Sequence, residues 1–395
     1  MRRATWMAMI LLAVASAAAR AQMADDELSP AAALPVVRWG DLDRDEPNQL
    51  TARLAYRRVD GVALYGGYRY HDATRRRPRL SVEGGYSFER EVGLWSAELS
   101  QPLLSDDRLV IGAGGWHATR HFDYDDAIVG SVENTLAALF FEDDYRDWYD
   151  GTGARVFGAW RWSRHWTVDA AAMVQDEEPL ANATDWSVFG GDDDFRDNPA
   201  AARGTRHGAG LAFTHDTRPK GVREGIPFIG EVERSNHDVV RLSWHGAGGP
   251  LGGDFDFGLV RLDARGFLKL TPTQFLAARL LLAASTGDSL PPQETLFAGG
   301  VSTLRAHPHK GERGDRLALA NVEYSVDVWN AIQAMVFLDF GRAWFDDLYP
   351  NGPNFHTDGG FGLQTRDQHL RVHLARDLTR DDGGLLLSVR TNATF

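Results

Sequence analysis

The sequence contains no cysteine. It therefore has no disulfide bond, no thiolate nucleophile and no cysteine-ligated metal site, and a chain of 395 residues can be stable without such cross-links. Three catalytic signatures are missing as well, since the chain has no G-x-S-x-G, P-loop or H-E-x-x-H motif. A membrane-embedded phospholipase is the enzymatic alternative, but serine and histidine are scattered without a nucleophile–base pattern. We therefore predict that the protein is not an enzyme and uses no cofactor.

The sequence has fewer basic residues than acidic residues. Lys and Arg total 42 against 55 Asp and Glu, a net charge of -13, which argues against nucleic acid as a partner. Much of the acid is clustered in the segments 123–126, 142–144, 176–178 and 192–194. We interpret these segments as solvated loops rather than calcium sites, because none has the ligand spacing of a known calcium loop.

Long apolar runs are absent beyond the N-terminus. Residues 4–19 are uncharged and apolar, follow Arg2-Arg3 and lead into Ala19-Arg20-Ala21. This order predicts a secretory signal peptide over residues 1–21, with an uncleaved membrane helix as the alternative. Residues 22–49 have no strand pattern and are expected to form a short periplasmic lead-in to a barrel domain at 50–395.

Without another apolar helix, a closed β-barrel is the remaining way to span a bilayer. Segments of about 9–12 residues alternate strictly. For example, Val336, Leu338 and Phe340 alternate with Phe337 and Asp339. A soluble sheet could alternate too, but polar residues recurring on the second face favour a water-filled lumen. The predicted strands are 50–59, 61–71, 79–88, 91–103, 107–117, 151–163, 165–175, 204–216, 225–236, 253–266, 272–286, 314–328, 330–345, 357–366, 368–378 and 384–395.

The predicted fold class is all-β, a transmembrane antiparallel barrel of about 16 strands, an even number as in bacterial barrels. Asp60-Gly61 predicts a tight hairpin between the first two strands. Segments 118–150, 176–203 and 287–313 are too long for turns and are expected to be external loops.

Three stretches resemble the barrel signature of the bacterial surface antigen family, which includes BamA-like and TamA-like proteins. They are Phe297-Ala298-Gly299-Gly300-Val301-Ser302-Thr303-Leu304-Arg305, Asn321-Val322-Glu323-Tyr324 and Phe337-Leu338-Asp339-Phe340-Gly341. Further pieces follow in the family's order, namely Asp216-Thr217-Arg218 with Gly225, Gly359-Gly360-Phe361-Gly362-Leu363 and Leu374-Ala375-Arg376. The resemblance covers residues 205–395 well and the first half loosely. Arg57-Arg58-Val59-Asp60-Gly61 also resembles members that lack periplasmic polypeptide-transport (POTRA) modules.

The resemblance implies that the 287–313 loop folds into the lumen and that Arg305 pairs with an acid on the inner wall. Because Phe337, Asp339 and Gly341 share one face, Asp339 is the expected partner, and Glu323 on the adjacent strand is the second choice. The alternative is that these charges meet only through water. Ala306 and His307 stand where the family has glycine and an aromatic residue, which leaves the conformation of the loop tip open.

The pair His307 and His309 is the one metal candidate that the spacing offers. Two histidines without a third ligand in spacing are more often ordinary loop residues, so we predict no metal site.

The family's activities imply a barrel of the bacterial outer membrane that aids insertion or transport of protein or lipid through a lateral seam. A static pore or structural surface barrel is the alternative. The expected partners are outer-membrane lipids and the host barrel-insertion machinery, for which the terminal Phe395 would be the signal. The client stays open, and so does the choice between a homodimer and a separate periplasmic partner.

Overall fold

The computed structural model describes residues 48–70, 77–104, 108–122, 131–190, 194–218, 235–287, 289–349, 352–366, 370–380 and 383–390. The predicted signal peptide, residues 22–47 of the lead-in and Phe395 lie outside these ranges. Among the described residues, no helix combines the length and the apolar content that crossing a membrane requires.

Sixteen antiparallel strands form a single sheet whose order follows the chain. They are β1 (Asn48–Arg57), β2 (Gly61–Tyr70), β3 (Arg79–Ser87), β4 (Val92–Pro102), β5 (Leu109–His121), β6 (Trp148–Arg161), β7 (Trp166–Pro179), β8 (Gly204–Asp216), β9 (His237–Ala247), β10 (Phe257–Thr271), β11 (Gln274–Thr286), β14 (Arg316–Trp329), β15 (Ile332–Trp344), β16 (His356–Thr365), β17 (Arg371–Asp377) and β18 (Leu385–Arg390). The predicted all-β barrel of about 16 strands is confirmed.

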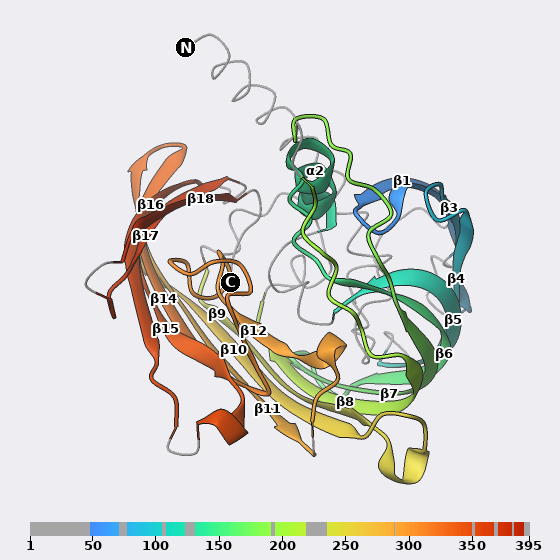
Figure 1. Cartoon of the computed structure of the whole chain (residues 1–395). Helices are drawn as coiled ribbons and strands as arrows, with labels where there is room; N and C mark the ends of the chain where they lie inside the picture. The colour runs from blue at the N-terminus through green and yellow to red at the C-terminus, as the bar shows by residue number, and fades with distance from the viewer. Residues whose placement is uncertain are drawn as a thin grey trace.

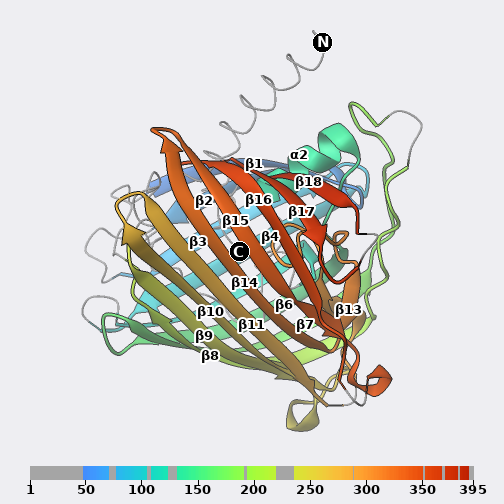
Figure 2. The same ribbon diagram turned by 90° about the vertical axis from the view of Figure 1, so that its left-hand side faces the viewer.

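Figure 1 looks along the cylinder into which this sheet curls. The segment between β11 and β14 lies inside it and includes the short strands β12 (Leu296–Ala298) and β13 (Glu312–Gly314), which pair with each other. We call residues 289–315 the plug. The helix α2 (Ser131–Phe141) lies between β1 and β18 in this view. Figure 2 shows tight hairpins such as β14–β15 at one end of the barrel and α2 and the long connections at the other, here called the loop end.

The wall is apolar outside and polar inside. In β15 the side chains of Val336, Leu338 and Phe340 are about half exposed, while Phe337 and Asp339 between them are buried. This period-two pattern places one set of side chains on each face of the sheet. The result is an apolar exterior around an interior that contains charged groups.

The structure differs locally from the sequence-based prediction. The prediction missed β9 at 237–247, where Val240, Leu242 and Trp244 form the alternating outer face; of the strand predicted at 225–236, residues 225–234 lie outside the described ranges. The predicted 118–150 loop contains α2, and it is shorter because β5 and β6 extend into it. Tyr56 shares the outward face of β1 with Leu54 by alternation, and it is buried there against Ala138 of α2 and Phe195.

Candidate functional site

The candidate site is the contact between the plug and the inner wall. Arg305 is buried, and its guanidinium holds both carboxylate oxygens of Asp339, with Nε 2.7 Å from Oδ2 and Nη2 2.6 Å from Oδ1. Its Nη1 donates to Oε1 of Glu323 at 2.5 Å. A planar bidentate pair of this kind is directional and strong when water is excluded. The structure therefore brings Arg305 to both of the acids that the sequence singled out.

The remaining predicted residues surround this pair. The guanidinium carbon of Arg305 lies 3.7 Å from the centre of the Phe337 ring, a cation–π contact. Gly341 follows on the same inner face, where a Cβ would meet the carbonyl oxygen of Ala318 at 2.5 Å. Gly299 has φ of 110°, and a Cβ there would lie 2.2 Å from the Pro308 carbonyl oxygen, so the turn into the plug tip requires glycine.

Gly300 has a positive φ of 99° and accepts the Thr303 amide at 3.0 Å, closing the turn that carries the chain toward Arg305. Phe395, the predicted insertion signal, lies outside the described residues.

Three carboxylates form a row across the inner wall. Strand register places Asp339 of β15 opposite Asp358 of β16, and Asp358 opposite Asp377 of β17. We call these residues the acidic row; all three are buried. Like charges directly opposite one another are destabilising unless cationic or N–H groups meet them. Of these three residues the sequence predicted only Asp339, because the spacing of residues along the chain does not reveal the register that aligns the three strands.

The plug tip supplies the partners of the acidic row in chain order. Arg305 pairs with Asp339, and the amide of Ala306 donates to Oδ2 of Asp358 at 2.7 Å. His307 Nδ1 lies 3.2 Å from Asp358, and its Nε2 lies 3.6 Å from Asp377. The hydrogen bond to Asp358 raises the pKa of His307 above its ordinary value; burial opposes this and the neighbouring acids reinforce it. The family pattern has glycine and an aromatic residue at these two positions of the loop. In this chain Ala306 and His307 stand there and contact the acidic row, so the loop tip matches an acidic wall.

Polar bonds extend the site to both sides. Asn321 links plug and wall, since its Nδ2 lies 2.8 Å from the Thr303 carbonyl and 2.7 Å from Asp339. Arg371 of β17 donates to the free oxygen of Glu323 at 3.2 Å. Asn321 and Arg371 lie on the inner face, as the alternation of their strands indicates. Alternation did not identify the residues with which they form hydrogen bonds.

The start of the plug is fastened to the opposite part of the wall. Glu294 pairs with Arg206 of β8 and accepts a hydrogen bond from Nε2 of His245 of β9 at 2.9 Å. Gln293 donates to Glu177 of β7 at 2.5 Å. An apolar cluster joins the plug residues Leu296, Ala298 and Leu304 to the wall residues Leu259, Leu281, Leu317, Leu319 and Ala343. The plug is thus packed and bonded on both sides of the interior.

Comparison with known proteins supports the fold and leaves the function open. The model of the C-terminal domain of a family of unknown function, DUF5686, matches residues 45–211, less than half of the chain. No curated protein matches the sequence.

Among solved structures, BamA from Haemophilus ducreyi lacking POTRA domains 1–3 is similar with a TM-score of 0.56 and 11% identity, over 88% of this chain and 70% of that one. CdiB from Acinetobacter baumannii and CdiB from Escherichia coli each give a TM-score of 0.45, at 13% and 15% identity. This chain spans 58% and 62% of their lengths, and they cover 87% and 88% of it. The family resemblance expected from the sequence is supported at the level of the barrel fold.

Proposed function

We propose that this protein is a plugged barrel of a bacterial outer membrane that helps insert or pass protein or lipid through a lateral seam between β1 and β18. The plug, pinned by Arg305 to Asp339 and Glu323, is the observation that carries this proposal. A plug bonded to both sides of the interior argues against a wide static pore. An apolar exterior supports the membrane location. The proposed role is not enzymatic.

The two edges of the sheet support the seam. Within the described ranges, β1 pairs only with β2, and β18 pairs only with β17. In lipid the free backbone groups of an edge strand must find partners, because no water is available to them. The two edges can satisfy this requirement by pairing with each other or with a strand of a client, as in strand addition. Exchange between these two arrangements is the proposed working cycle.

Leu385, Leu387 and Val389 of β18 are exposed on its outer face, as contact with lipid at this edge requires. Outer-membrane lipids and the host insertion machinery are the proposed partners. A homodimer and a separate periplasmic partner both remain compatible with the proposal.

Cysteine pairs test the seam in a chain that has no native thiol. Ala52 and Leu54 of β1 and Leu387 and Val389 of β18 all project outward, so a small panel of pairs among them can be cross-linked. Leu54 and Leu64, directly opposed in the β1–β2 ladder, give a matched control that locks the wall away from the seam.

The readout is complementation of a chromosomal deletion, scored by outer-membrane integrity. We expect the oxidised seam variants to lose function and regain it on reduction, while L54C/L64C functions in both states. Full function of a seam variant that is cross-linked in most molecules would contradict lateral opening.

Conductance in planar bilayers tests the plug separately. We expect small or no steady conductance from the wild type and larger openings from R305A and from a deletion of residues 287–313. A large steady conductance from the wild type would favour the static pore.

A further inference from the structure

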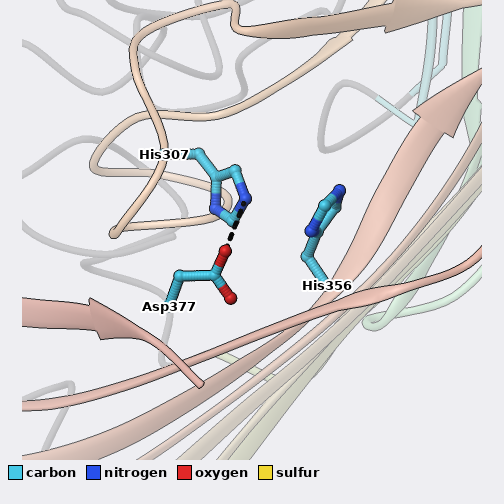
Figure 3. A group of neighbouring side chains, drawn as sticks. All are labelled: His307, His356 and Asp377. Carbon is cyan, nitrogen blue, oxygen red and sulfur yellow. Dashed lines mark ion pairs between the residues drawn. The ribbon is translucent and has the colours of Figure 1, made fainter. Parts of the chain in front are cut away.

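We propose that the loop end of the barrel contains a binding site for a divalent transition-metal cation of the zinc class, formed by His307 of the plug, His356 of β16 and Asp377 of β17. The three residues each offer a donor atom, and these atoms all lie within 4.8 Å of one another. Figure 3 shows the two imidazole rings and the carboxylate turned toward a common centre. This inference does not depend on the proposed function.

Each donor residue has its other polar atom held by a neighbour. Nδ1 of His307 bonds Asp358 at 3.2 Å, which leaves Nε2 toward the centre. Nε2 of His356 bonds Glu312 at 2.7 Å, which leaves Nδ1. Oδ1 of Asp377 accepts the Thr379 amide at 2.8 Å, which leaves Oδ2. Metal-binding histidines characteristically donate their second N–H to a carboxylate in this way.

One of the inward atoms has no other use. Nδ1 of His356 is buried and has no hydrogen-bond partner among the described residues. A buried polar nitrogen without a partner costs free energy, and a bound cation would remove that cost.

The geometry is close to what zinc requires. Ligand bonds of about 2.0–2.2 Å in a tetrahedron place donor atoms about 3.4 Å apart. Nε2 of His307 and Oδ2 of Asp377 are already 3.6 Å apart, and the ring centres of His307 and His356 are 4.5 Å apart. Small rotations of the side chains complete the site, with water as the fourth ligand.

The local charge and the donor types favour such a cation. Glu312, Asp358 and Asp377 contribute three carboxylates, and Arg342, with Nε 3.5 Å from Glu312, offsets part of that charge. Two imidazoles with one carboxylate suit zinc-class ions, whereas magnesium and calcium prefer sites made of oxygen alone. A bound ion would join the plug to β16 and β17, the strands that precede the edge strand β18.

The sequence predicted no metal site, because His307 and His309 lacked a third ligand in spacing. The remaining donors come from two later strands, which no spacing rule detects. His309 lies apart, with Nε2 2.9 Å from the carbonyl oxygen of Tyr145.

Zinc binding to the folded, detergent-purified full chain tests the site. After chelator treatment, Zn²⁺ alone is titrated at neutral pH by calorimetry, and bound metal is counted after gel filtration. We expect one ion per chain in the wild type and in the matched control H309A. H356A and D377N, which remove proposed ligands, should weaken binding at least about 10-fold, and D358N, which changes the group that orients His307 and not a ligand, by about 10-fold.

A second readout covers variants that fold poorly. Zn²⁺ should slow proteolytic cleavage of the plug in the wild type and in H309A but not in H356A, with each variant first shown to be heat-modifiable on a gel. Mg²⁺ and Ca²⁺ should give no protection. Equal zinc affinity in the wild type, H356A and D377N would overturn the proposal, as would absence of a stoichiometric site in the wild type.

Discussion

Nζ of Lys310 in the plug lies 2.6 Å from Oδ2 of Asp147, a residue 163 positions earlier in the chain. Asp147 also pairs with Arg58 of the β1–β2 turn at 3.0 Å and with Arg196 at 2.6 Å. One buried carboxylate, which lies just before β6, therefore joins the plug to the β1–β2 turn and to the segment that contains Arg196.

Replacing this carboxylate should loosen the loop end. D147N removes the carboxylate that pairs with Lys310 and one of the partners of both Arg58 and Arg196, and removing one member of a buried ion pair costs about 3 kcal/mol. The measurement is the urea concentration that converts half of the protein from the fast to the slow gel band. An unchanged midpoint would mean that water or other acids replace Asp147.

The same residue gives a pH dependence. Burial raises the pKa of Asp147, but Lys310, Arg196 and Arg58 outweigh it, so the pKa lies below its ordinary value. A depressed carboxyl pKa contributes stability above the unfolded pKa of about 3.8–3.9, and that contribution is lost as pH falls through the folded pKa. The midpoint difference between wild type and D147N should therefore shrink in acid. A constant difference down to the lowest workable pH would contradict this.

Arg305 should not be replaceable by lysine. R305K keeps a charge but loses the fork that holds both oxygens of Asp339 and the contact with Phe337. R305A should cost about 3 kcal/mol, and R305K should lie closer to R305A than to the wild type. The exposed pair of Arg203 with Glu178 provides the control, since R203K should change stability by less than about 0.5 kcal/mol. Equal urea midpoints for R305K and wild type would refute the bidentate role.

Gly341 should resist even a methyl group. The Cβ in G341A would lie 2.5 Å from the Ala318 carbonyl and 2.9 Å from Cα of Leu319, both in the facing strand. Such overpacking costs about 1–3 kcal/mol. G84A is the matched control, because a Cβ at Gly84 meets nothing within 4 Å. The measurement is the folded fraction of each variant on an unboiled gel. Comparable folded fractions for G341A and G84A would show that β14 shifts to accommodate the added methyl group.

Deletion of Phe395 should lower the inserted fraction in cells while leaving the folded barrel as stable as the wild type. This expectation follows from the family resemblance, in which a terminal aromatic residue is the signal for insertion. Fractionation of outer membranes measures it. Normal insertion after the deletion would place the signal elsewhere.

Much of the wall was predictable because alternation is a local property. A strand with one face toward an apolar exterior and the other toward polar groups repeats every two residues, and β8 at 204–216 matches its prediction. The same pattern is present in β9. The prediction missed this strand because it assigned a strand to the preceding segment, 225–236.

The site was predictable only in part, because its contacts depend on register. The family resemblance identified Arg305, and the alternation of β15 identified Asp339. Asp358 and Asp377 meet the plug because three strands align at one level, and Asp147 meets Lys310 because two long connections converge at one end. Neither relation leaves a signature in a single sequence.

The order of the strands also has a consequence for how the molecule folds. Each ladder of the large sheet joins strands that follow one another in the chain, apart from the step over the plug between β11 and β14. Hairpins of this kind close short loops, whereas the contact of Lys310 with Asp147 requires two distant segments to meet. The hairpins of the wall can therefore form early, whereas docking of the plug must wait until the distant segments that it contacts are in place.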